Sequence, residues 1–352
     1  MAKGERLARH GWMSSELGSY SDRQLASMVD RAAPRGTGIG GTSAVLEVDR
    51  TPVFVKRIRL TDIERKTSNV ESTANLFGLP VKCQYGVGSP GFGAWRELAA
   101  CITTTDWVLS GLSDAFPLLY HWRVLPGVGP RAGDAASMER EVAFWGGSSA
   151  LRGRLAALAD ATASLVLFLE FVPYTLEAWL SAQVAEGRVA SEAAAVLMEA
   201  QLLSTVELMN AAGIHHFDGH FGNLLTDGRQ LFFADFGLAT SPSFELSEAE
   251  ARFLHENRTH DSGYAAMRLV NWLVATFAGV GPACTVEERN GLVRALADGA
   301  GVAGAPEAVS RLVDRLAPVA AVMNGFYYEL FTGSRAARYP AGRVAEALAA
   351  RP

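Results

Sequence analysis

A short hairpin with acidic and amide side chains at its base constrains the fold of this chain more than any other stretch. Two apolar runs, at residues 223–225 and 231–234, flank the dipeptide Asp227-Gly228. This dipeptide strongly favours a tight turn between antiparallel strands. Three side chains rich in oxygen lie beside the two runs: Asp218, Asn223 and Asp235. The pattern predicts a strand, a turn and a strand that bring these three groups to one end.

The three groups have the chemistry of a magnesium site with an additional base. Hard cations such as Mg²⁺ take oxygen ligands and usually combine one or two carboxylates with substrate phosphates. Asn223 and Asp235 supply such a pair, which leaves Asp218 for another task. A competing interpretation is a zinc site at His215, His216 and His220. It is disfavoured because no cysteine pair lies nearby and the spacing matches no common zinc pattern.

A glycine-rich stretch lies upstream, between two predicted strands. Glycines there allow backbone N–H groups to approach phosphates closely. Two registers of the pattern are possible: Gly36, Gly38 and Gly41, or Gly38, Gly40, Ser43 and Val45. The second is preferred because it leads directly into the strand that ends at Lys56. A dinucleotide-binding Rossmann loop does not fit, since such a loop opens a helix and this one precedes a strand.

A lysine that contacts phosphates needs a carboxylate to hold it in place. Residues 92–109 have apolar positions at three- and four-residue spacing, which predicts an amphipathic helix carrying Glu97. Glu97 is therefore the preferred partner of Lys56, with Glu64 and Glu71 as alternatives.

The order of these groups along the chain resembles the protein-kinase-like superfamily. The order is Asp218, Asn223 and then Asp235-Phe-Gly, with His216 two residues before Asp218. This superfamily includes Ser/Thr protein kinases and aminoglycoside phosphotransferases. The resemblance covers roughly residues 35–280 by its motif order. It implies an α+β, bilobal protein-kinase-like fold, with a small antiparallel β N-lobe that carries inserts and a larger, mostly helical C-lobe.

The resemblance also implies ATP and Mg²⁺ as cofactors and assigns roles to residues. The implied catalytic residues are Asp218, Lys56 and Glu97, and the implied metal ligands are Asn223 and Asp235. The implied nucleotide-binding residues are Gly38, Gly40, Gly41, Ser43, Val45, Lys56, Glu170 and Val172. Glu170 and Val172 stand where these enzymes join their lobes and receive adenine on backbone groups.

The predicted division of the chain has three parts. Residues 1–34 form an N-terminal helical extension, including a helix at 22–31 capped by Ser21 or Asp22. Residues 35–172 form the N-lobe, which ends in strands at 117–125 and 163–172 and has insertions at about 61–91 and 126–162. Residues 173–352 form the C-lobe, in which Asp261 either braces the catalytic loop or caps a helix.

The identity of the acceptor is less constrained. The stretch from Asp218 to Asn223 is similar to the Asp-x-His-x-x-Asn of aminoglycoside-type kinases, and no Ala-Pro-Glu follows Gly237. Phe217 and His220 stand where Ser/Thr protein kinases usually have Arg and Lys. The prediction is therefore a phosphotransferase acting on a hydroxylated small molecule, such as an antibiotic or metabolite. A Ser/Thr protein kinase is the alternative, suggested by the hydroxyl-rich residues 240–243, and a pseudokinase scaffold is less favoured.

Bulk properties agree with this interpretation. With 352 residues the chain exceeds what one hydrophobic core usually serves. A net charge of −5 argues against nucleic acid as a partner. Three widely spaced cysteines suit a reducing compartment, and neither a leader peptide nor a membrane span is expected, so a cytoplasmic location is predicted.

Overall fold

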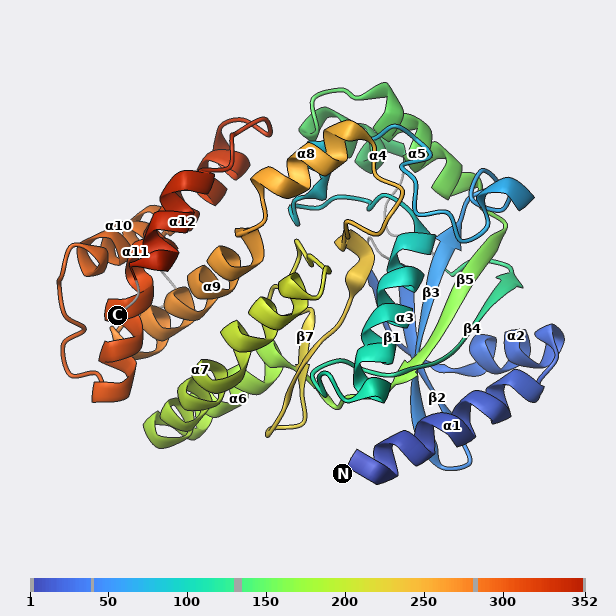
Figure 1. The fold of residues 1–352 in the computed structure, drawn as a ribbon, viewed down its shortest axis with the longest axis horizontal. Helices are drawn as coiled ribbons and strands as arrows, with labels where there is room; N and C mark the ends of the chain where they lie inside the picture. The colour runs from blue at the N-terminus through green and yellow to red at the C-terminus, as the bar shows by residue number, and fades with distance from the viewer. Residues whose placement is uncertain (1–2, 39–40, 130–134, 281–283, 351–352) are drawn as a thin grey trace. The chain divides into compact units, whose positions relative to one another are not determined.

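The structure is a computed structural model that describes residues 3–38, 41–129, 135–280 and 284–350 (Figure 1). Two compact units make up the chain. Unit 1 comprises Met1–Val172 and Phe232–Ala249, and unit 2 comprises Pro173–Leu231 and Glu250–Pro352. The fold class is α+β, with an N-terminal five-stranded antiparallel sheet followed by a largely helical region. Residues 232–249, which the sequence-based division placed with the C-terminal part, belong to unit 1.

The sheet of unit 1 has the strand order β1-β2-β3-β5-β4 and is antiparallel throughout. Its strands are β1 (Ala33–Gly38), β2 (Gly41–Val48), β3 (Thr51–Leu60), β4 (Leu119–Pro126) and β5 (Ala163–Glu170). The strands predicted at 117–125 and 163–172 are confirmed as β4 and β5. On the central strand β3, Lys56 pairs with Ser43 on one side and Leu167 on the other. This central position holds its backbone from both sides.

Five α-helices accompany this sheet in the described part of unit 1. They are α1 (Lys3–Ser19), α2 (Asp22–Arg31), α3 (Ala94–Ser110), α4 (Ala135–Phe144) and α5 (Ser149–Asp160). Figure 1 shows α3 lying against the sheet. The Glu64 carboxylate accepts a 2.9 Å hydrogen bond from the N–H of Ala94, the first residue of α3. Gly111, in the left-handed region at φ 81°, ends the helix. The helix predicted at 92–109 is thus confirmed as α3.

The N-terminal extension contains two helices rather than one. Ser21 caps α2 in a capping box with Gln24, so this predicted helix and its cap are confirmed. The preceding helix α1 was not predicted; Figure 1 shows it beside β4, and His10 on α1 lies 3.1 Å from the carbonyl oxygen of Leu119. Strand β1 begins at Ala33, so the sheet takes in the last two residues of the predicted extension.

A buried arginine anchors α1 to the end of β5. The Arg6 guanidinium donates to the Glu170 carboxylate at 2.9 Å from Nε and 2.6 Å from Nη2. It also donates to the carbonyl oxygens of Asp114 and Phe116. Arg6 and Glu170 are each only 7% exposed. Because a buried charge needs its partner, this ion pair ties the N-terminal helix to the sheet.

Replacing Arg6 with Met is expected to destabilise the fold by about 3–5 kcal/mol, because the Glu170 carboxylate would stay buried without its counter-ion. Urea denaturation followed by circular dichroism measures this change. Arg9→Met, on the exposed side of the same helix, is the control and should change stability by less than about 0.5 kcal/mol. Equal stability of the two variants would show that the Arg6 pair does not hold α1 in place.

The two predicted insertions differ in structure. Residues 61–91 contain only the short 3₁₀ turns η1 (Thr67–Asn69) and η2 (Val81–Gln84), whereas α4 and α5 lie in the segment 126–162. The first segment is nevertheless well packed, with Leu79 and Cys83 buried. Its backbone is therefore held by tertiary contacts and not by a regular ladder.

Unit 2 is mostly helical. Its helices are α6 (Leu176–Glu186), α7 (Arg188–Ala211), α9 (His260–Phe277), α10 (Val286–Ala297), α11 (Glu307–Thr332) and α12 (Ala341–Ala349). Helix α8 (Glu248–Glu256) continues from the last residues of unit 1 into unit 2. Figure 1 shows α9 and α11 packed side by side, and Leu273 and Val319 are among their fully buried residues.

Helix α7 has the length and apolar composition of a membrane-spanning helix, a feature that the sequence analysis did not single out. Its residues Met198, Leu202, Val206 and Met209 recur at three- and four-residue spacing and are buried within the protein. This is the pattern of a core helix with one buried face. The absence of a membrane span stays a prediction.

The hairpin at residues 224–233 has the form that its sequence predicts. Strands β7 (Leu224–Thr226) and β8 (Leu231–Phe233) follow β6 (Tyr174–Thr175) in a three-stranded sheet ordered β6-β7-β8. Gly228 has φ 88°, where a glycine carries no steric penalty. The Asp227 carboxylate accepts hydrogen bonds from the N–H groups of Arg229 and Gln230. The turn is therefore held by its own side chain.

Candidate active site

A buried lysine joins two carboxylates in unit 1. The Lys56 Nζ atom lies 2.5 Å from Glu97 Oε1 and 2.8 Å from Asp235 Oδ1. Lys56 comes from β3, Glu97 from the first turn of α3, and Asp235 lies two residues after the end of β8. Of the three glutamates considered from the sequence, the structure places Glu97 against Lys56 and uses Glu64 to begin α3.

Burial and charge act in opposite directions on these groups. Burial by itself would lower the pKa of the Lys56 ammonium, but the charges of Asp235 and Glu97 outweigh it and raise that pKa. Burial raises the pKa of Glu97 to about 7; Lys56 lowers it, and the nearby charge of Asp235 raises it further. The Asp235 side chain is 43% exposed, so solvent reaches its carboxylate. Lys56 is therefore a fixed cation with one buried and one accessible carboxylate.

Aromatic packing positions the segment that carries Asp235. Phe236 is buried, and its ring centroid lies 6.3 Å from that of Phe116. Asp235 has φ 58°, an unusual backbone conformation for a residue with a side chain. A Cβ atom on Gly237 would lie 3.4 Å from Glu97 Oε2 and 3.3 Å from Asp235 Oδ1, so a larger residue there would press on both carboxylates.

The described part of the glycine-rich stretch lies within β1 and β2. Gly38 pairs with Gly41 at the end of the ladder. Gly41 has φ 125°, and a Cβ atom there would collide with the carbonyl oxygen of Arg57. Ser43 and Val45 lie on β2, where Ser43 is the partner of Lys56 across the ladder. Gly40, also predicted to bind nucleotide, lies outside the described residues.

Asp218 and Asn223 hold one another in the loop of unit 2 that precedes β7. The Asn223 Nδ2 group donates to the backbone oxygen of Asp218 at 2.9 Å and to its Oδ2 at 3.1 Å. The Asp218 side chain is 22% exposed. His220 Nε2 lies 4.0 Å from Asp218 Oδ1. The loop thus presents a partly exposed carboxylate whose orientation is set by a neighbouring amide.

Asp261 braces this loop. Its carboxylate accepts hydrogen bonds from the backbone N–H groups of His216 at 2.7 Å and Phe217 at 2.9 Å, and from Asn210 Nδ2 at 2.9 Å. Phe217 has φ 61°, and its ring stacks on His260 at 4.7 Å between centroids. Of the two roles left open by the sequence, the contacts favour the brace, since α9 begins at His260 without a side-chain cap.

The Asp261 contacts predict a pH-dependent loss of stability. Burial alone would raise the pKa of this carboxyl, but the contact with His260 and the hydrogen bond from Asn210 hold that pKa well below its usual range. The lowered pKa means that the ionised carboxylate stabilises the fold above the unfolded pKa of about 3.9. This contribution is lost as the pH falls towards the folded value. Asp261→Asn is expected to cost about 2–4 kcal/mol at pH 7, and clearly less near pH 3.

Urea unfolding at both pH values measures this difference. Asp314→Asn, at an exposed position of α11, is the matched control and should change stability little at either pH. If Asp261→Asn lowered the free energy of unfolding by the same amount at both pH values, the charge of the Asp261 carboxylate would not contribute to holding the loop.

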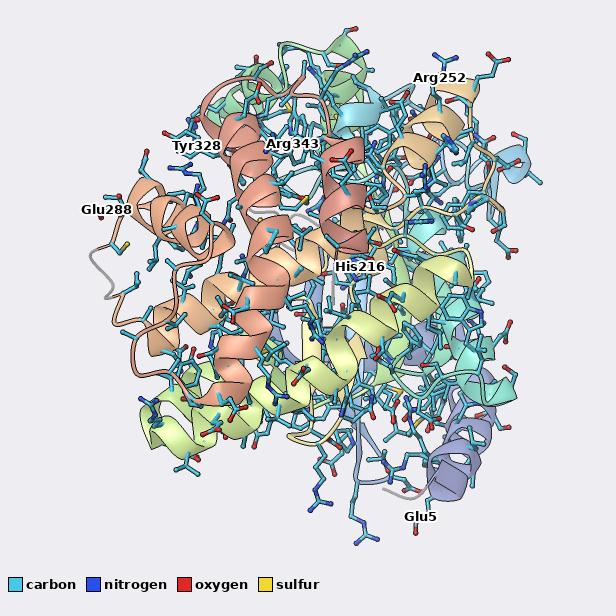
Figure 2. All side chains as sticks on the ribbon, turned by 60° about the vertical axis from the view of Figure 1, so that its left-hand side comes forward. Glu5, His216, Arg252, Glu288, Tyr328 and Arg343 are labelled. Atoms are coloured by element: carbon cyan, nitrogen blue, oxygen red, sulfur yellow. The ribbon has the colours of Figure 1, made fainter. Side chains whose placement is uncertain are left out.

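The three histidines considered as zinc ligands have separate tasks. His216 Nδ1 accepts from the N–H of Asp218, and His220 Nδ1 accepts from the N–H of Gly222. His215 is buried, and burial lowers its pKa. Among the described residues, no group of three or more His, Cys, Asp or Glu side chains is arranged to hold a metal ion. Figure 2 shows His216 among the helices of unit 2, whereas Glu288 points outward from α10.

Two predicted nucleotide contacts lie at the end of β5. The N–H of Glu170 donates to the carbonyl oxygen of Leu118, and its carboxylate is paired with Arg6. The Glu170 side chain is therefore a structural anchor. A role for Glu170 or Val172 backbone groups in adenine binding stays a prediction.

Sequence reasoning missed several residues that position the site. Asn210, Phe217 and His260 shape the loop before Asp218, and Arg6 anchors Glu170. The one available signal was Asn210 near the end of a predicted helix, four residues before the loop. The other contacts join distant parts of the chain and leave no local pattern.

Comparison with known proteins does not extend this assignment. No protein-family model matches the chain, and no curated protein sequence matches it at a significant level.

Proposed function

We propose that the protein transfers the γ-phosphoryl group of ATP to a hydroxyl group of a small molecule. The observation that carries this proposal is the contact of Lys56 with both Glu97 and Asp235. A lysine fixed by a helix glutamate, close to the Asp of an Asp-Phe-Gly stretch, is the arrangement that phosphoryl transfer uses for the ATP phosphates. Asp218 and Asn223 in unit 2 have the chemistry that the same reaction requires of a base and a metal ligand.

In the proposed reaction the acceptor oxygen attacks the γ-phosphorus, and the bond from that phosphorus to the β,γ-bridging oxygen breaks. ADP leaves with the electron pair of that bond, and the hydroxyl proton passes to the Asp218 carboxylate. Lys56 binds phosphate oxygens, while Glu97 keeps the ammonium in place. The protein mainly positions groups and neutralises charge, as expected for a loose transition state.

Asn223 and Asp235 each have the chemistry of a Mg²⁺ ligand. The Asn223 amide donates from Nδ2 to Asp218, and its Oδ1 accepts no hydrogen bond from the described residues. The Asp235 carboxylate is accessible to solvent. An amide oxygen and a carboxylate are ligands that Mg²⁺ accepts together with substrate phosphates. A Mg²⁺ ion held by such ligands would offset the negative charge of the phosphates.

The hydrogen bonds that Glu245 accepts from residues 72–74 favour a small-molecule acceptor over a protein. Glu245, eight residues after Gly237, accepts hydrogen bonds from Ser72 Oγ at 2.5 Å and from the N–H groups of Thr73 and Ala74. The pKa of Glu245 is lowered, and the hydrogen bond from Ser72 is the main cause. In regulated protein kinases a phosphorylated residue orders the segment that follows the Asp-Phe-Gly stretch. Here the carboxylate of Glu245 already holds this segment in place.

The alternative acceptor is a Ser or Thr side chain of a protein, and one feature favours it. Ser243 is exposed in the segment after Gly237, where the enzyme itself could be phosphorylated. A pseudokinase is disfavoured, because a binding module needs neither a base nor metal ligands.

Transfer of ³²P from labelled ATP tests the proposal. The full chain is incubated with Mg²⁺ and two parallel panels, hydroxylated small molecules and proteins that include the enzyme itself. Label on small molecules is the expected result, and label on proteins alone would identify a protein kinase. If neither panel takes up label although ATP binds, the chain is a nucleotide-binding scaffold.

A further inference from the structure

Two arginines of unit 2 have no carboxylate partner. The side chains of Arg268 on α9 and Arg289 on α10 form no ion pair or hydrogen bond with the described residues. Both side chains are partly buried, and the Arg289 Nε atom is fully buried. The acidic residues beside Arg289 are engaged elsewhere, since Glu287 accepts from Tyr328 and the Glu288 carboxylate accepts from the N–H of Thr285 in the capping box of α10. Partly buried guanidinium groups without a counter-ion are unusual, because burial of a charge is costly.

Arg268 lies next to the loop that carries Asp218. The Arg268 guanidinium stands over the ring of Phe221, with its Cζ atom 5.3 Å from the ring centroid. Phe221 is three residues from Asp218. Helix α10, which carries Arg289, packs against α9, which carries Arg268. Burial and the charge of Arg268 both lower the pKa of the Arg289 guanidinium, as expected for two neighbouring cations. A positive site therefore borders the predicted catalytic loop within unit 2.

One face of α9 connects this positive site to the base. Asp261, Tyr264 and Arg268 are spaced by three and four residues and so lie on the same side of the helix. Asp261 binds the loop backbone at one end of this row, and Arg268 contacts Phe221 at the other. Burial raises the pKa of Tyr264 to about 12, while Arg268 lowers it and Asp218 raises it, so Tyr264 is within electrostatic reach of both.

We propose that Arg268 and Arg289 bind an oxyanion of the acceptor, which makes the acceptor a hydroxylated small molecule with a phosphate or carboxylate group. That the bound anion belongs to the acceptor rests on the proposed function. Guanidinium groups present several N–H donors to the oxygens of phosphates and carboxylates and form strong, charge-assisted hydrogen bonds with them. Arg268 lies seven residues, about two helical turns, from Asp261 along α9, so the anion would bind beside the loop that carries the base.

The same charges disfavour a polycationic acceptor. An aminoglycoside carries several ammonium groups, and like charges brought together at a partly desolvated site repel. The acceptor class is accordingly a sugar phosphate or hydroxy acid rather than an aminoglycoside.

Four sugars of matched size provide the first test: glucose, glucose 6-phosphate, gluconate and glucosamine. We expect ³²P transfer to glucose 6-phosphate or gluconate at a kcat/KM at least about 10-fold above that for glucose, and least for glucosamine. A preference between the first two separates a phosphate from a carboxylate ligand. Arg268→Gln and Arg289→Gln should remove this preference mainly by raising KM, and Arg294→Gln, an exposed arginine on α10, should leave it unchanged.

The second test does not depend on turnover. Inorganic phosphate is titrated calorimetrically into the full chain loaded with Mg²⁺ and a non-hydrolysable ATP analogue. The phosphate Kd should rise about 10-fold in Arg268→Gln and Arg289→Gln, and not in Arg294→Gln. Equal affinity in all four proteins, or a preference for glucose or glucosamine, would overturn the anion site. If phosphate binding depends on the arginines while no sugar is labelled, the anion site stands and the proposed transferase activity fails.

Discussion

Asp235→Asn should reduce the turnover number for phosphoryl transfer by at least about 10³-fold, equivalent to about 4 kcal/mol of transition-state stabilisation. The substitution removes a negative charge from the accessible carboxylate proposed to hold Mg²⁺, while Lys56 keeps its contact with the buried Glu97. Lys56 loses one of its two ionic partners in this variant, but Glu97 still holds it and the glycine-rich stretch is unchanged, so ATP should still bind with a Kd changed by less than about 10-fold.

Rates of ³²P transfer and calorimetric titration with ATP measure these two quantities on the same preparations. Asp106→Asn is the control, because Asp106 is an exposed carboxylate on α3 in the same unit. This variant should turn over like the wild type. Near wild-type activity of Asp235→Asn would remove Asp235 from the catalytic machinery and with it the main support for the proposed function.

Asp218→Asn should lower the turnover number by about 10²–10⁴-fold, the range typical for loss of a positioned general base. An amide keeps an oxygen acceptor for the Nδ2 group of Asn223, so the loop should keep its conformation. The variant cannot take the hydroxyl proton at neutral pH. We therefore expect ATP and acceptor to bind as in the wild type while the chemical step becomes slow.

Single-turnover kinetics distinguishes this outcome from slow product release, because only the chemical step is followed. Asp227→Asn is the matched control from the same hairpin segment; its side chain is exposed and an amide oxygen can still accept the turn hydrogen bonds. A fast chemical step in Asp218→Asn would mean that another group accepts the proton.

The anion site gives these experiments a defined acceptor. If Arg268 and Arg289 bind a phosphate or carboxylate, the acidic sugars are the substrates with which both variants are best assayed. High salt should weaken the binding of these anionic sugars, because salt screens the interactions of partly exposed charges. The Debye length is about 10 Å at 0.1 M ionic strength and shortens as salt is added.

Several elements could be predicted from the sequence because their causes are local. The turn at Asp227-Gly228 follows from backbone preferences, and the start of α2 follows from a capping box four residues long. Helix α3 follows from apolar residues at helical spacing. The order of Asp218, Asn223 and Asp235 was sufficient to propose phosphoryl transfer, because that reaction needs a base and oxygen ligands.

Other features could not be predicted because they join distant residues. Helix α1 has few apolar residues in a regular pattern, and its anchor Arg6 contacts Glu170, 164 residues away. The segment 61–91 has little regular structure, so no periodicity reports its buried contacts. The sequence does not reveal that the guanidinium groups of Arg268 and Arg289 lack a counter-ion. The structure reveals it, because Glu287 and Glu288 accept hydrogen bonds from other residues.

The sequence by itself determined which chemical groups are present, in what order, and on which local elements they lie, because turns, caps and helical periodicity depend on neighbouring residues. Only the tertiary structure decided which groups are partners. It paired Lys56 with Glu97 and not with Glu64 or Glu71, and it made Asp261 a brace for the loop. The physical reason is burial: a charge withdrawn from water must find its counter-ion or donor in the fold, and that choice depends on packing across the whole chain.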